Sequence, residues 1–149
     1  MSISTKVRVN THYTRSVNLE RDANVVAVTK NYIPTSRALR TFKRVVDTFS
    51  PEDVPRSWSW VGPYGSGKSS ASAFLGQLLA GAGTEGNVVA QSVLAKASED
   101  IAQDYQKANQ AENGWLKVFL TGSPESMGQR LMKSLYGSAK AYWETLGFD

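Results

Sequence analysis

The sequence contains no cysteine and a single histidine, His12. Without cysteine the chain forms no disulfide and offers no thiolate ligand to a metal, which suits a reducing compartment. One histidine also argues against a histidine-rich metal site. No apolar run approaches the roughly 18 residues of a membrane-spanning helix, and the N-terminus lacks the apolar core of a signal peptide. We therefore expect a cytoplasmic protein with no membrane segment.

Basic residues outnumber acidic ones in the first part of the chain. The net charge is +4, and residues 1–56 carry ten Lys or Arg against five Asp or Glu. Such a basic segment fits a nucleic acid, or the phosphates of a nucleotide bound next to it. Because its charges are scattered singly, without the interleaved aromatic residues of a single-strand binding surface, the nucleotide is the favoured interpretation.

One stretch has a spacing that is specific to phosphate binding. An apolar run over residues 58–61 is followed by Gly62, Pro63, Tyr64, Gly65, Ser66, Gly67, Lys68, Ser69 and Ser70, and then by helix-forming residues. The order Gly-x-x-x-x-Gly-Lys-Ser is the P-loop, or Walker A, motif, whose glycines let backbone N–H groups approach a polyphosphate. Lys68 is the predicted catalytic cation for the β- and γ-phosphates, and Ser69 is the predicted Mg²⁺ ligand. Residues 62–70 therefore predict binding of ATP with Mg²⁺.

Apolar periodicity predicts helices over residues 35–49, after Lys68, over 92–109, and after Pro124 and Glu125. Runs rich in aromatic and β-branched residues predict strands at 58–61 and 115–121, with a weaker strand or loop over 84–89. Residues 20–31 are expected to form a loop. The domain interpretation is an extended N-terminal arm over 1–31, followed by the first part of a nucleotide-binding domain over 32–149.

The segment Tyr32, Ile33, Pro34 and Thr35, followed by an Arg-rich helix, a turn and the Walker A strand, resembles the N-terminal part of AAA+, STAND and related P-loop ATPases. The resemblance implies an α/β fold with three α/β/α layers and a parallel sheet, incomplete in this chain. It also implies that Tyr32, Ile33 and Pro34 line the pocket for the base; alternatively they only seat the helix on the sheet. The whole front end is similar to large bacterial ATP-binding proteins of the anti-phage defence kind.

The acid that would complete a magnesium site, the Walker B residue at the end of a second strand, is missing. The run Val118, Phe119, Leu120 ends at Thr121 and Gly122, whereas hydrolysis needs a carboxylate there. Two explanations remain: the chain is a piece of a longer ATPase, which the small number of strands favours, or it is a small domain that turns nucleotide over slowly or not at all.

The favoured function is an ATP-binding module that couples nucleotide binding and hydrolysis to conformational change on a nucleic acid or a protein partner. A second copy of the chain is a further candidate partner. One alternative is a small-molecule kinase, for which Arg130 is the only arginine in the second half of the chain. The other alternative is an interaction domain that binds a nucleotide without hydrolysing it.

Overall fold

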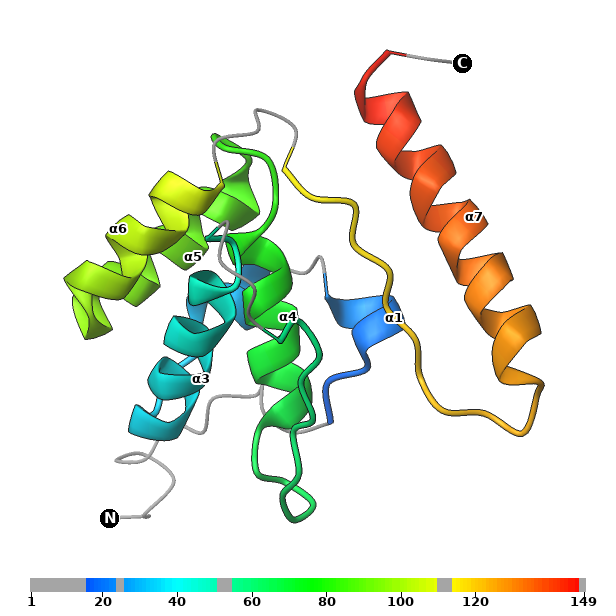
Figure 1. Cartoon of the computed structure of the whole chain (residues 1–149), viewed down its shortest axis with the longest axis horizontal. Coiled ribbons are helices and arrows are strands. Elements are labelled where there is room, and N and C mark those ends of the chain that lie inside the picture. Colours follow the sequence, from blue (N-terminus) through cyan, green and yellow to red (C-terminus); the bar gives the residue numbers. More distant parts are fainter. Residues whose placement is uncertain (1–15, 24–25, 51–54, 110–113, 148–149) are drawn as a thin grey trace, which may run out of the picture.

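The computed structural model describes residues 16–23, 26–50, 55–109 and 114–147. The described chain forms helices α1 (Leu19–Asp22), α2 (Val26–Lys30), α3 (Ser36–Asp47), α4 (Lys68–Leu78), α5 (Glu85–Ala97), α6 (Glu99–Ala108) and α7 (Met127–Thr145). Figure 1 shows α3, α5 and α6 grouped around α4, while α7 runs along the opposite side of the molecule. Most of the predicted N-terminal arm, including His12, lies outside the described residues.

The predicted α/β fold with a parallel sheet is wrong, and the resemblance to P-loop NTPases fails with it. Among the described residues there is no strand or sheet, and the only β-type pairing is an isolated antiparallel bridge between Ala80 and Gly114. Residues 58–61 and 115–121 have no regular secondary structure and do not pair with each other. Aromatic and β-branched residues make a segment compatible with a strand, but a strand also needs a neighbour for its backbone hydrogen bonds.

Three shorter segments also differ from the prediction. The expected loop over 20–31 contains α1 and α2, and residues 85–89 form the start of α5. The Thr84 side chain accepts a hydrogen bond from the backbone N of Asn87, so Thr84 is the N-cap of α5. The helix expected over 92–109 is two helices, because Ser98 has extended backbone angles (φ −163°, ψ 104°) that separate α5 from α6.

The core lies between α3, α4, α5 and α6. Its largest fully buried side chains include Phe42 of α3, Phe74 of α4, Leu94 of α5 and Tyr105 of α6. The rings of Phe42 and Phe74 stack with centroids 5.6 Å apart. Tyr105 donates a hydrogen bond from its hydroxyl to the backbone O of Phe42, at 2.9 Å. These contacts fix α3 against α4, and this arrangement positions the site described next.

Within the described ranges, no helix combines the length and the apolar character that crossing a bilayer requires.

Candidate functional site at the start of α4

The loop before α4 has the predicted left-handed backbone at two of its three motif glycines, Gly65 and Gly67, but not at Gly62. Gly65 and Gly67 have φ values of 78° and 81°, a left-handed conformation that residues with a side chain rarely adopt. Gly67 is the N-cap of α4, and no side chain accepts a hydrogen bond at this cap. The first N–H groups of a helix have no partner within the helix and carry its positive dipole end. The start of α4 is therefore suited to an anion.

The loop curls around the ammonium group of Lys68. The Nζ atom donates to the backbone O of Gly62 at 2.8 Å, to the backbone O of Pro63 at 2.9 Å and to Ser66 Oγ at 3.3 Å. At the tip of the loop, the Tyr64 hydroxyl lies 2.6 Å from Ser16 Oγ. Lys68 is thus held at the mouth of the loop by neutral acceptors.

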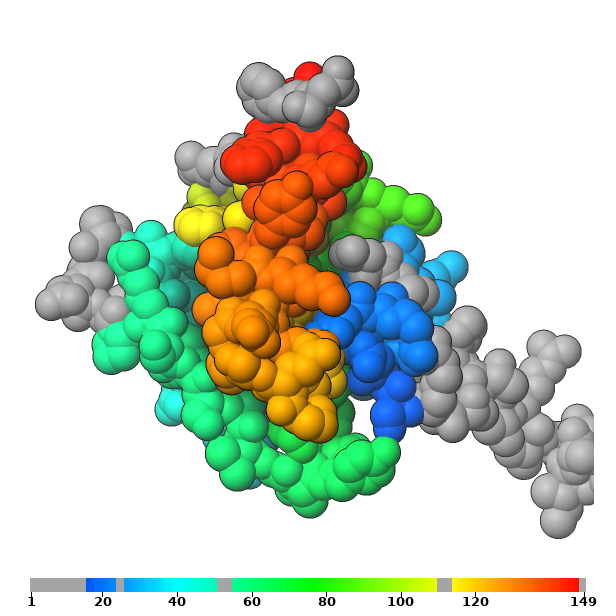
Figure 2. Space-filling model, turned by 90° about the vertical axis from the view of Figure 1, so that its right-hand side faces the viewer, coloured from blue at the N-terminus to red at the C-terminus, as the bar shows by residue number. Residues whose placement is uncertain are grey.

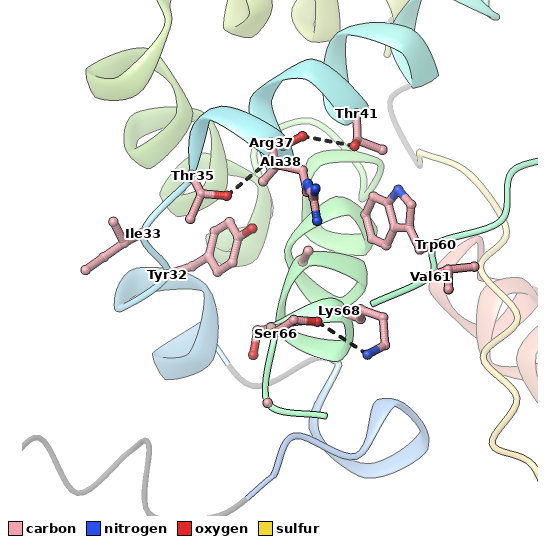
Figure 3. A pocket seen from close by; sticks show the side chains of 14 residues that line it. Tyr32, Ile33, Thr35, Arg37, Ala38, Thr41, Trp60, Val61, Ser66 and Lys68 are labelled. Carbon is pink, nitrogen blue, oxygen red and sulfur yellow. Dashed lines mark hydrogen bonds between the residues drawn. The ribbon is translucent and has the colours of Figure 1, made fainter. Parts of the chain in front are cut away.

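A cavity of about 470 Å³ extends from this loop to the segment before α3. Figure 3 shows it between α3, α4 and the extended residues Trp60 and Val61. Of the residues predicted to bind a nucleotide, the cavity is lined by Tyr32, Ile33, Gly65, Ser66, Gly67, Lys68 and Ser70. The predicted residues outside its lining are Pro34, Gly62, Pro63, Tyr64 and Ser69.

The sequence analysis offered two alternative roles for Tyr32: lining a pocket for the base, or seating the following helix. Its ring centroid lies 4.6 Å from that of Phe74 and 6.3 Å from that of Phe42, so it packs on the core and holds the segment before α3. The same side chain also lines the cavity, beside the exposed Ile33. No sheet is involved in this packing, contrary to the expectation.

Four polar or aromatic lining residues were missed by the sequence analysis: Thr35, Arg37, Thr41 and Trp60. Figure 3 shows the Arg37 side chain pointing from α3 into the cavity, toward the side occupied by Lys68. The periodicity of α3 predicts which residues face the core, but it does not show that its arginine faces a ligand cavity. Arg130, the arginine considered for a kinase, instead bonds to Glu20 through Nη2 and lies outside this lining.

The lining combines two cationic side chains, the hydroxyls of Ser66 and Ser70, and two aromatic rings. It contains no carboxylate among the described residues, and no group of three or more His, Asp or Glu in the described ranges is placed to hold a metal. Such a lining is complementary to a polyanion that carries a flat apolar group. Mg²⁺ prefers carboxylate and phosphate oxygens, so these residues fit an ion carried by a ligand's own phosphates better than a resident metal.

Comparison of the chain with known protein families, with curated proteins and with solved structures gives no match in any of the three.

Proposed function

We propose that the cavity at the start of α4 binds ATP as its Mg²⁺ complex, with the phosphates at residues 62–70 and the base toward Tyr32 and Ile33. One observation carries the proposal. A single cavity joins the start of α4 to the segment that the sequence analysis assigned to the base.

The phosphate end depends on Lys68 and the loop. The Lys68 ammonium donates to two carbonyls and one hydroxyl. A phosphate oxygen carries a negative charge that attracts the ammonium, an attraction that a neutral carbonyl or hydroxyl oxygen lacks. A phosphate oxygen that enters the loop is therefore expected to replace at least one of these acceptors, while the N–H groups of the first turn of α4 bind its other oxygens.

The base end offers rings and apolar surface. Tyr32, Ile33 and Trp60 all line the cavity, and stacking of a base on an aromatic side chain contributes about 1–3 kcal/mol. The volume of about 470 Å³ lies within the range of roughly 300–1,000 Å³ that is usual for small-molecule sites. The choice of adenine over other bases remains a proposal from the sequence.

Binding is the first activity to test. Hydrolysis requires a group that orients the attacking water and an acid that helps to hold the magnesium, and no described residue that lines this cavity is an acid. That observation favours nucleotide binding without turnover by these residues. Coupling to a nucleic acid or a protein partner in the cytoplasm, as part of a larger ATPase, is the wider proposal.

The test is thermal unfolding of the chain with and without Mg²⁺ and ATP. A ligand at a hundredfold excess over its Kd stabilises the native state by about 2.7 kcal/mol. We expect Lys68→Ala to lose most of this ligand-dependent shift. Because Lys68 also bonds to the loop, its loss can change the stability of the chain without any ligand. The shift of the variant is therefore measured from the melting temperature of the same variant without ATP.

Lys96→Ala is the matched control, because Lys96 is an exposed lysine of α5 outside the cavity lining. It should keep the full shift. Inorganic triphosphate in place of ATP tests the phosphate end alone. An equal ATP-dependent shift in the wild type and in Lys68→Ala would falsify the proposal.

A further inference from the structure

A second cavity lies between α7 and the rest of the molecule. Its volume is about 320 Å³, and its walls come from α1, residues 117–119 and α7. In Figure 1 the extended residues 115–126 pass between α4 and α7, and Figure 2 shows α7 and α1 side by side on this face of the molecule. The second cavity shares no lining residue with the cavity at α4. A ligand bound here is therefore separate from the proposed nucleotide.

Hydrogen bonds on both sides of the second cavity hold its walls together. Glu20 of α1 accepts from the backbone N of Thr121 at 2.8 Å and from Nη2 of Arg130 on α7. Near the other end of α7, the Tyr142 hydroxyl donates to the backbone O of Gly114 at 3.1 Å. These contacts fix α7 to α1 and to the extended segment, so the space between them is bounded by bonded elements.

Three half-buried polar side chains in the lining have no hydrogen bond or ion pair to any described residue: Lys117, Ser134 and Ser138. The two serines are four residues apart on α7, so they share one face of the helix. Burial lowers the pKa of Lys117, because a partly buried ammonium loses water that no partner replaces. The donors of all three side chains are therefore available to a ligand that accepts hydrogen bonds.

The charges of the lining leave one positive charge uncompensated. Glu20 is the other charged residue that lines the cavity, and the Arg130 guanidinium already pairs with its carboxylate. A ligand with one negative charge matches Lys117, whereas a second negative charge on the ligand would be repelled by Glu20. This balance favours a carboxylate over a phosphate dianion.

The rest of the lining gives the ligand an apolar surface, which Leu19, Ala23 and Phe119 supply. The Phe119 ring packs closely on α4, because a Cβ atom built at Gly76 would lie 2.6 Å from its Cζ. The volume of about 320 Å³ lies at the lower end of the roughly 300–1,000 Å³ that is usual for small-molecule sites. The space therefore suits a small molecule with an apolar part.

We propose that this second cavity binds a small organic monocarboxylate. Its carboxylate accepts hydrogen bonds from the Lys117 ammonium and from the hydroxyls of Ser134 and Ser138, and its apolar part lies toward Phe119. A charged hydrogen bond to Lys117 replaces the water that burial removed. The proposal does not depend on the cavity at α4, and its test contains no nucleotide.

The first experiment titrates the isotope-labelled full chain with hexanoate and follows the backbone amides by NMR. We expect saturable shifts at residues 117–119 and 134–138. Hexanamide, which has the same apolar chain without the charge, should bind about tenfold more weakly or less, since it lacks the charged hydrogen bond. Inorganic phosphate should leave these amides unchanged.

The second experiment removes the charge with Lys117→Met, which keeps an apolar side chain of similar length. Hexanoate should bind about tenfold more weakly to this variant. Its melting temperature without ligand should not fall, because Lys117 bonds to no described residue. Lys133→Met is the matched control, since Lys133 is an exposed lysine of α7 outside the lining, and it should bind hexanoate like the wild type.

The third experiment fills the cavity from α7. Gly137 lines the cavity, and a Cβ atom added there meets no atom within 4 Å, so Gly137→Leu should fold and should weaken hexanoate binding. Gly128→Leu is the control, because Gly128 also has open space and lies on α7 outside the lining. Hexanoate that leaves the cavity amides unmoved, that binds Lys117→Met as tightly as the wild type, or that is outcompeted there by inorganic phosphate would overturn the proposal.

Discussion

Lys68 of α4 and Arg37 of α3 line the same cavity, but they differ in their hydrogen bonds. Lys68 is bonded to acceptors of its own loop, whereas the Arg37 guanidinium has no hydrogen bond or ion pair to any described residue. With none of its donors bonded to a described residue, Arg37 can present its planar fork to phosphate oxygens. We therefore expect Arg37 to contribute to binding although it lies outside the Walker A spacing.

The prediction for Arg37→Gln is a loss of ATP affinity of about tenfold or more. A hydrogen bond to a charged group contributes about 1.5–3 kcal/mol, and about 1.4 kcal/mol corresponds to a factor of ten in Kd. Isothermal titration calorimetry of the wild type and the variant measures the ratio directly. The melting temperature without ligand should hardly change, because Arg37 is exposed.

Arg40→Gln is the matched control for this measurement. Arg40 is an exposed arginine on the same helix, and it does not line the cavity. Its loss changes the net charge of the chain by the same amount. If both variants bind ATP with the same reduced affinity, the effect comes from net charge and Arg37 makes no direct contact.

At the scale of the element, the sequence predicted features that are encoded locally. The apolar stripe over residues 35–49 predicted a helix, which is α3 in the structure. Thr35 caps α3 by accepting a hydrogen bond from the backbone N of Ala38. The helix after Lys68 and the helix after Pro124 were also predicted, as α4 and α7. Each depends on residues within a few turns, so a single segment contains the information.

The predictions that failed depend on contacts between distant segments. Residues 58–61 and 115–121 have the composition of strands but do not pair with each other, and pairing cannot be deduced from either segment alone. The same holds at the site. The Walker A spacing predicts the left-handed backbone of Gly65 and Gly67. The presence of Arg37 and Trp60 in the cavity depends on how α3 and residues 58–61 pack, which no single segment encodes.

The C-terminal end of α4 shows another long-range contact. The last carbonyls of a helix have no partner within it. The Asn87 side chain donates to the backbone O of Gln77 at 3.2 Å and of Leu78 at 3.0 Å. The Asn109 side chain donates to Leu78 O at 3.3 Å and to Ala80 O at 2.7 Å. Two buried amides, from different parts of the chain, therefore bind the end of the central helix.

Asn87→Ala should lower the free energy of unfolding by about 1–3 kcal/mol, because it leaves buried carbonyls without one of their donors. Urea denaturation followed by circular dichroism measures the change. The control is Gln103→Ala, since Gln103 is exposed on α6 and, among the described residues, its amide bonds only to the Glu99 side chain. Similar losses in the two variants would contradict a capping role for Asn87.

At the scale of the whole molecule, the core contains an ionisable side chain that burial keeps neutral. Tyr105 is fully buried between α6 and α3, and its hydroxyl donates to Phe42 O. Burial first, and the negative charge of Asp47 second, raise the pKa of Tyr105 well above its usual value. The folded protein therefore keeps the Tyr105 proton at pH values where the unfolded chain releases it.

This difference gives stability a definite dependence on pH. The unfolded tyrosine ionises near pH 10, so the contribution of Tyr105 is complete below that pH and is lost as the pH rises toward the folded pKa. The free energy of unfolding should then fall by up to about 1.4 kcal/mol per pH unit from this group.

Tyr105→Phe should be less stable at neutral pH by about 1 kcal/mol, through the lost hydrogen bond, but should lose less stability than the wild type above pH 10. Urea denaturation of both proteins at neutral and alkaline pH measures the two slopes. Parallel losses would mean that other groups, and not Tyr105, control alkaline unfolding.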